Sequence, residues 1–187
     1  MKRKTITSGI FVLVAVLSAT WQIQAQDTKA PDAKTPYPRM APLDQYLMTD
    51  RNAEIALARS AAPESISRDA EVLLLGRKGY ETAIKGKNGF VCLVARSWMS
   101  PFGSEEFWNP KIRAPECYNP PAVLSFLPYA VKATVMALSG FSKSQIFDGI
   151  KAAVDKRELG APARGSLIYM MSRQAYLPTK ATVASAI

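Results

Sequence analysis

The most informative absence in this chain is histidine, which occurs at none of its 187 positions. Catalytic Ser-His-Asp and Cys-His arrangements, histidine proton shuttles and nearly all catalytic zinc sites need that side chain. The sequence also has no Gly-x-Ser-x-Gly, Ser-x-x-Lys, Gly-x-Gly-x-x-Gly, P-loop, Cys-x-x-Cys or EF-hand pattern. We therefore expect no motif-defined catalytic residue, no metal and no cofactor.

Long hydrophobic runs are lacking as well. The longest lies at residues 10–19, follows a basic stretch at residues 2–4, and is too short to span roughly 30 Å of membrane hydrocarbon. This layout, followed by a polar stretch that ends at Ala25, is typical of a secretory signal peptide. We predict that residues 1–25 are a cleaved signal peptide and that the protein is exported, periplasmic or extracellular, with no transmembrane span after cleavage. An uncleaved anchor is the alternative.

Cysteine is scarce, since Cys92 and Cys117 are the only two. Two cysteines in an exported chain favour a disulfide. Closing a loop of about 25 residues stabilises a fold by roughly 3–4 kcal/mol on the chain-entropy account. We predict a Cys92–Cys117 disulfide; a pair of buried free thiols is the alternative.

The charge balance is moderately basic. The chain has 24 Lys and Arg against 15 Asp and Glu, and loss of the three basic residues at 2–4 leaves 21 against 15. The basic residues are spread along the chain, whereas nucleic-acid binding uses a concentrated basic stripe or a recognisable module. We expect a solvated basic surface near an anionic cell envelope and no nucleic-acid partner.

The distribution of proline and apolar residues predicts the domain organisation. Residues 26–42 carry four prolines among small and charged residues, which favours an extended linker. Residues 43–178 are predicted to form a single domain, because a chain of this length supports one core. Residues 179–187 are predicted to be an unstructured tail.

The first half of the domain alternates short apolar runs with turn residues. The sequence predicts three strands, over residues 72–75, 80–84 and 90–95. Asn88-Gly89 before the third run is a strong signal for a type I′ hairpin. Both faces of the third run are apolar, which indicates a central strand covered on both sides. We predict a small antiparallel sheet in which these strands form a meander.

The second half of the domain is predominantly helical. Ahead of the strands, the sequence predicts a helix over residues 43–62, best supported over 50–60, with Thr49 or Asp50 as N-cap. After the strands it predicts helices over residues 121–139 and 142–158, and Pro128 either kinks the helix over 121–139 or starts a second one. Asn119 is a favourable N-cap for the helix over 121–139, and Ser142 with Gln145 forms a capping box for the helix over 142–158. The run at residues 165–172 is strand-like and is predicted to join the sheet by a long-range pairing. The fold class is therefore α+β, with C-terminal helices packed on the sheet and one long disulfide-bounded loop.

The stretch between residues 97 and 119 shows neither a helical nor a strand period. Its prolines and Gly103 exclude a long regular element, and loops of this length tend to be functional or disordered. Aromatic faces there could stack on sugars or apolar ligands, and basic groups could bind carboxylate or phosphate. The candidate ligand-binding residues are Arg96, Trp98, Trp108, Lys111, Arg113 and Tyr118. The alternative is a mini-core in which the aromatic side chains are buried against the sheet.

The carboxylates of the same stretch support a second hypothesis. A glycosidase needs two carboxylates at a fixed separation across a sugar. Glu105 and Glu106 would point apart in an extended chain, so Glu105 with Glu116 is the plausible pairing. The alternative is that Glu105 and Glu106 are solvated and answer Lys111 or Arg113.

One resemblance adds to this picture. The run from Tyr80 to Pro121, with NGFVCLVARSW, FWNPK and a Cys-x-Asn-Pro close, followed by YMMS, resembles an uncharacterised family of exported bacterial proteins with no assigned activity. The resemblance covers about residues 40–177 and implies no catalytic residue. It also implies that relatives continue past YMMS, where this chain diverges into PTKATVASAI.

Taken together, the residues favour a non-enzymatic exported domain. We expect a binding or structural role that uses the stretch between the two cysteines. Its partner would be a small molecule, a glycan or a component of the cell envelope. A carboxylate-type hydrolase that acts on glycans is the alternative.

Overall fold

The computed structural model describes residues 36–177, and the structural statements below concern that part of the chain. The predicted signal peptide, most of the predicted linker and the predicted tail lie outside it. Within the described range, no helix combines the length and apolar character needed to cross a membrane.

Five strands form one mixed sheet in the order β2–β1–β3–β4–β5. The strands are β1 (Glu71–Leu75), β2 (Tyr80–Ile84), β3 (Val91–Ala95), β4 (Ala114–Tyr118) and β5 (Ile168–Tyr169). The helices are α1 (Arg51–Arg59), α2 (Glu64–Ser67), α3 (Pro120–Ser125), α4 (Leu127–Leu138) and α5 (Lys143–Asp155).

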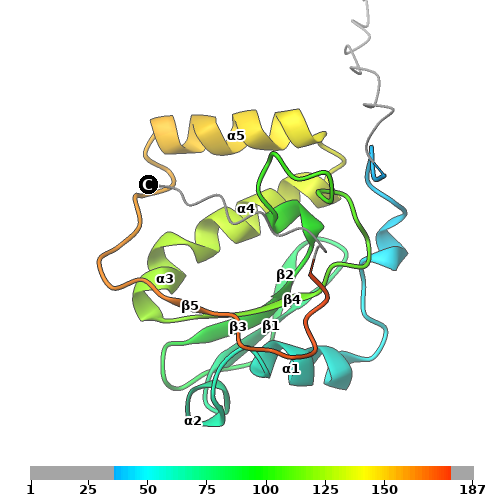
Figure 1. Ribbon diagram of the computed structural model, residues 1–187. Coiled ribbons are helices and arrows are strands. Elements are labelled where there is room, and N and C mark those ends of the chain that lie inside the picture. Colours follow the sequence, from blue (N-terminus) through cyan, green and yellow to red (C-terminus); the bar gives the residue numbers. More distant parts are fainter. Residues whose placement is uncertain (1–35, 178–187) are drawn as a thin grey trace, which may run out of the picture. The chain divides into compact units, whose positions relative to one another are not determined.

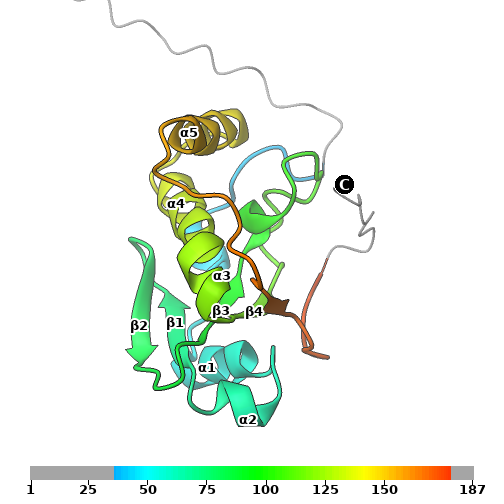
Figure 2. The same cartoon turned by 90° about the vertical axis from the view of Figure 1, so that its left-hand side faces the viewer.

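The helices cover both faces of the sheet (Figure 1). Helix α1 lies on one face with α2 beside it, while α3 and α4 lie on the other face. Figure 2 shows α5 stacked on the side of α4 that points away from the sheet. The predicted α+β class, with C-terminal helices packed on the sheet, is confirmed.

The predicted meander is wrong, because β2 and β3 are not neighbours. Strand β1 lies between them; it pairs with β2 in antiparallel fashion and with β3 in parallel fashion. After β2 the chain crosses the end of β1, where Lys87 N–H donates to the Asp69 carbonyl and Glu71 N–H donates to the Phe90 carbonyl, both at 2.8 Å. This crossing brings β3 to the far side of β1 and runs it in the same direction.

The Asn88-Gly89 pair forms part of that crossing and not a type I′ hairpin. Such a turn needs a positive φ at both central residues. Gly89 has φ 77°, but Asn88 does not share it. Instead, the Asn88 side chain donates to the Ile66 carbonyl and accepts from Phe90 N–H. Gly86 is also required, since a Cβ there would lie 2.3 Å from the Glu71 nitrogen.

The stretch between the cysteines contains a strand that was not predicted. Strand β4 pairs with β3 in antiparallel register, with Cys92 opposite Cys117. It is preceded by a single 3-10 turn, η2 (Ser97–Met99). The proline in APECY argued against a strand, because proline cannot donate to a ladder.

The outer side of β4 explains how that proline is accommodated. Arg113 N–H donates to the Tyr176 carbonyl and Asn119 N–H to the Leu167 carbonyl, both at 3.0 Å. Alternation directs the nitrogen of Pro115 to this same side, where it has no hydrogen to offer. The C-terminal segment leaves β4 there, and Met171 N–H donates to the Ala61 carbonyl instead. The predicted strand at 165–172 is consequently reduced to the two residues of β5.

The predicted helix caps are confirmed, although residues 43–45 form only the 3-10 turn η1 and do not belong to α1. Asp50 caps α1 by accepting from two backbone N–H groups. The Asn119 side chain accepts from Ala122 N–H at the start of α3. Ser142 and Gln145 form the full capping box of α5. Residues 121–139 form two helices, α3 and α4, and Pro128 lies in the first turn of α4, so this proline is at the start of a second helix rather than at a kink.

The folded part begins before Leu43. Tyr37, Met40 and Ala41 pack against a buried cluster that includes Trp98 and Phe107. Ala41 N–H also donates to the Tyr46 hydroxyl at 3.1 Å. The described end of the predicted linker is therefore part of the core.

Candidate functional site

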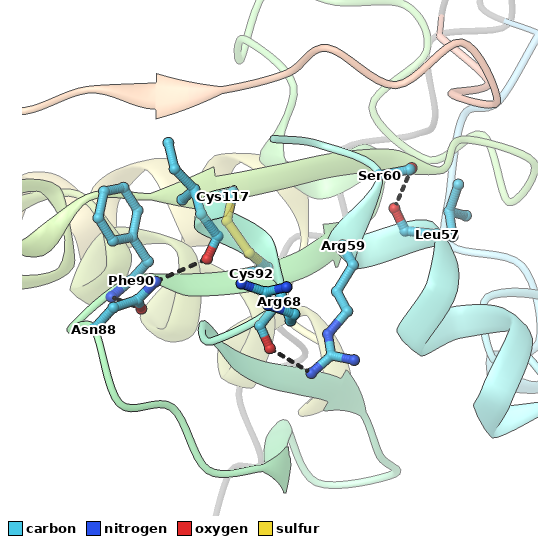
Figure 3. The surroundings of a disulfide bond; sticks show 9 residues. Leu57, Arg59, Ser60, Arg68, Asn88, Phe90, Cys92 and Cys117 are labelled. Carbon is cyan, nitrogen blue, oxygen red and sulfur yellow. Dashed lines mark hydrogen bonds between the residues drawn. A yellow bond between two sulfur atoms is a disulfide. The ribbon is translucent and has the colours of Figure 1, made fainter. Parts of the chain in front are cut away.

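The predicted disulfide is present between Cys92 of β3 and Cys117 of β4. The two residues face each other across the strands, with their Cα atoms 4.0 Å apart, as in a non-hydrogen-bonded antiparallel pair. Both cysteines are fully buried on the α1 face of the sheet, in a cluster with Leu57 and Val94. Figure 3 shows the bond linking the two neighbouring strands, and the burial of both residues leaves it inaccessible from the surface.

Arg96, the first predicted binding residue, is held inside the protein. It is 1% exposed, and its guanidinium lies 2.7 Å from the Glu54 carboxylate of α1. Its Nε–H donates to the Tyr46 carbonyl at 2.7 Å, and its Nη1–H donates to the Val94 carbonyl. These partners occupy the guanidinium, so Arg96 is not placed to bind a ligand.

The two tryptophans of the stretch do not form an open aromatic surface. Trp98 is 1% exposed and Trp108 is 5% exposed. The Trp98 indole N–H donates to the Thr134 hydroxyl at 3.0 Å. The Tyr46 hydroxyl donates to the Trp108 carbonyl at 2.7 Å. The mini-core alternative therefore describes these two side chains.

The two remaining basic candidates, Lys111 and Arg113, have different surroundings. Lys111 is exposed. Arg113 is half-buried and donates to the carbonyls of Pro110, Ile112 and Gln45. Burial, with a further contribution from the charge of Arg96, lowers the pKa of Arg113 to about 10. The predicted cationic rim is not assembled around one ligand position.

The structure contains a pocket that the sequence did not reveal. It has a volume of about 240 Å³ and lies between β4 and α4, with η2 and α5 at its ends. Five aromatic side chains line it: Trp98, Phe102, Tyr118, Phe126 and Tyr129. Aliphatic side chains complete the wall: Met99, Ala130, Ala133, Ile150 and Ile168. Its remaining lining residues are Ser100 and Glu116.

Glu116 is the distinctive member of this wall. Alternation along β4 directs its side chain to the α3/α4 face, together with that of Tyr118. The Tyr118 hydroxyl donates to Oε2 of Glu116. Burial raises the pKa of the Glu116 carboxyl to about 7, although the hydrogen bond from Tyr118 acts in the opposite direction. Glu116 therefore titrates near neutrality.

Among residues 36–177, no lysine or arginine forms an ion pair with Glu116. The ion pairs of that range join Arg77 to Asp44, Arg96 to Glu54, Lys132 to Glu158 and Lys151 to Asp155. Two other polar groups of the pocket wall already have partners, since Trp98 donates to Thr134 and the Tyr129 hydroxyl donates to the Gly160 carbonyl. The Ser100 hydroxyl has no hydrogen-bond partner among the described residues. The pocket is thus an apolar space with one unpaired acid.

The predicted pairing of Glu105 with Glu116 is not found in this pocket. Glu105 is exposed and is not among the lining residues. The carboxylate of Glu106 accepts from the Asn109 side chain rather than from Lys111 or Arg113. In the described residues, no group of three or more acidic or cysteine side chains is arranged to hold a metal ion.

A second, shallower depression lies beside α3 and α4. Its volume is about 450 Å³, and its wall includes Val123, Val131 and Leu159. The charged residues at its edge, Lys132 and Glu158, form an ion pair in which Nζ and Oε2 are 3.6 Å apart. It lacks the unpaired group that distinguishes the first pocket.

One sequence signal pointed toward the pocket. If APECY is taken as a strand, Glu116 and Tyr118 share a face that would be buried under the following helices. The pocket itself depends on residues from four further elements, whose meeting no local pattern reports. Comparisons of the chain with protein-family models, with curated proteins and with solved structures find no significant match.

Proposed function

We propose that this chain is an exported, non-enzymatic domain that binds a small and largely apolar molecule in the pocket between β4 and α4. The observation that carries the proposal is Glu116, a carboxyl without a cationic partner in an aromatic-lined space. Burial of such a group costs stability. Perturbed acids in apolar pockets are typical of functional sites.

The stretch between the cysteines takes part in this site, although not as an exposed platform. Trp98, Met99, Ser100 and Phe102 form one wall, and Glu116 directly precedes Cys117. The disulfide anchors β4, which carries the acid. It also supports the proposal of export, because disulfides persist in oxidising compartments.

A glycan hydrolase receives less support. Both retaining and inverting mechanisms use two carboxyl groups that flank the scissile bond. The pocket wall holds one carboxyl, and Glu105 is not part of it. A single acid suits recognition of a ligand better than hydrolysis of a glycosidic bond.

The test is a ligand screen with a variant that fills the pocket. Ala133 of α4 lines the cavity and is 7% exposed, so Ala133→Leu places three more carbons in the ligand space. Val135→Leu is the matched control, because Val135 lies on the same helix, is 43% exposed and does not line the pocket. Intrinsic tryptophan fluorescence reports binding through Trp98.

The expected result is saturable binding of small apolar compounds to the wild type and to Val135→Leu. Affinity for Ala133→Leu should be weaker by at least about tenfold, since a filled pocket forfeits the ligand's buried contacts. A screen that yields no compound whose affinity depends on the size of residue 133 would refute the proposal.

A further inference from the structure

Two polar groups of the pocket wall have no hydrogen-bond partner among the described residues, namely Oε1 of Glu116 and the Ser100 hydroxyl. Oε2 of Glu116 accepts from the Tyr118 hydroxyl, while Oε1 has no hydrogen-bond partner among the described residues. Of the donors in the wall, Trp98 is bound to Thr134 and Tyr129 to Gly160. A ligand that donates to Oε1 would complete the site, whereas one that needs several donors would not be satisfied.

The charge of the site indicates what that donor is. A carboxylate in an apolar space is stabilised most by a positive charge in hydrogen-bond contact. Within residues 36–177, no lysine or arginine supplies one to Glu116. The aromatic side chains around the acid also favour a cation, because ring faces attract positive charge.

Resting on the proposed function, we infer that the ligand is a small organic amine. Its protonated amino group donates to Oε1 of Glu116, and its apolar body packs against the aromatic wall. The volume of about 240 Å³ lies below the usual range of about 300–1,000 Å³ for drug-sized ligands, so the amine carries a single ring or a short chain.

Three probes of nearly equal size test the inference. They are 2-phenylethylamine, the neutral 2-phenylethanol and the anionic phenylacetate, each titrated into the purified chain at pH 8 by calorimetry. Charge-assisted hydrogen bonds are roughly twice as strong as neutral ones. We therefore expect the amine to bind at least about tenfold more tightly than the alcohol, and phenylacetate to bind most weakly.

Glu116→Gln is the matched variant, because it keeps the shape of the side chain and removes the charge. The preference for the amine over the alcohol should fall to about twofold or less, while affinity for the alcohol stays nearly unchanged. Circular dichroism of the variant establishes that it is folded. Unchanged amine preference in folded Glu116→Gln would overturn the inference.

The pH dependence gives an independent readout. Amine affinity of the wild type should fall as the pH is lowered from 8 to 5.5, because Glu116 takes up a proton. The phenols near the acid, Tyr80 and Tyr118, have pKa values raised by burial and do not titrate in that range. The Tyr129 hydroxyl, also in the wall, is bound to Gly160. Alcohol affinity, and amine affinity of Glu116→Gln, should stay flat.

The outcomes separate this inference from the proposed function. If the three probes bind equally and Ala133→Leu weakens all of them, the pocket binds ligands but not through an amine, and only this inference fails. If none of the probes binds to the wild type, the inference fails; the screen with Ala133→Leu then decides the proposed function separately.

Discussion

Two carboxyl side chains, one on each face of the sheet, have opposite surroundings, since Glu54 is buried with a cation and Glu116 is half-buried without one. On the α1 face, Glu54 lies 2.7 Å from Arg96, and both residues are at most 2% exposed. On the α3/α4 face, Glu116 receives only the hydrogen bond from Tyr118. The protein itself supplies the cationic partner of Glu54, whereas a ligand could supply one to Glu116.

Alternation along two strands produces this difference. In β3 and β4, Cys92, Val94 and Cys117 point toward α1, while Leu93 and Glu116 point toward α3 and α4. One face of the same short strands therefore carries the disulfide and a closed core. The other carries the pocket. Substitutions on the two faces should consequently affect different properties, stability in one case and binding in the other.

The largest expected effect is a loss of stability on the α1 face, when the buried ion pair of Arg96 and Glu54 is broken. Arg96→Met leaves Glu54 buried without its cation, and breaking a buried ion pair in this way costs about 3–5 kcal/mol of unfolding free energy. Urea denaturation measures the loss. The double variant Arg96→Met with Glu54→Met should recover most of it, because the uncompensated charge is gone. A single-variant loss below about 1 kcal/mol would contradict the prediction.

The disulfide should be next in size. Replacing both Cys92 and Cys117 with alanine is expected to lower the unfolding free energy by about 3–4 kcal/mol, since the unfolded chain regains the freedom of the loop. Ligand affinity of the folded variant should remain within about twofold, because the bond lies on the face away from the pocket. A large loss of affinity in folded protein would show that the two faces are not independent.

On the α3/α4 face, Glu116 should make the stability of the protein depend on pH. The pKa of Glu116 is about 7 in the folded protein against an ordinary 4.5, so the folded state holds the proton more tightly. This contribution is fully present below pH 4.5 and is lost as the pH rises through 7. Relative to Glu116→Gln, the wild type should lose up to about 3 kcal/mol between pH 4 and pH 9. Denaturation curves with a constant difference across that range would contradict this.

The smallest expected effect on stability comes from Asn119, the N-cap of α3. Asn119 caps α3 and also accepts from Leu167 N–H and donates to the Gly165 carbonyl. Asn119→Ala should cost about 1–2 kcal/mol. Asn119→Asp keeps the acceptor oxygen and should cost less than half as much. Equal losses in the two variants, measured by thermal unfolding, would show that the donor to Gly165 dominates.

Much of this fold could be predicted because its signals are local. Caps such as Ser142 with Gln145 act within one helical turn, and β1 and β3 are short apolar runs bounded by turn residues. The disulfide could be predicted from the expected export of the chain and from its having two cysteines. These features do not depend on which distant segments meet.

The errors arose where pairing is non-local. A parallel β1–β3 pair is indistinguishable from a hairpin in the local pattern, because Asn88-Gly89 serves equally well in a crossing. The pocket was missed for the same reason, since Ile150 and Glu116 come from segments far apart in the chain. Whether Trp98 and Trp108 form an exposed surface or a buried mini-core stayed open at the level of sequence, because residue type alone does not report burial.

Pro115 has a consequence for the behaviour of the protein in a crowded solution. The outer edge of β4 is paired on either side of this residue but not at it. Unpaired strand edges can recruit strands from other molecules and start aggregation. A foreign strand would find no N–H to bind at Pro115, so it could not complete a ladder along β4. Pro115 therefore limits the pairing of a foreign strand along this part of β4.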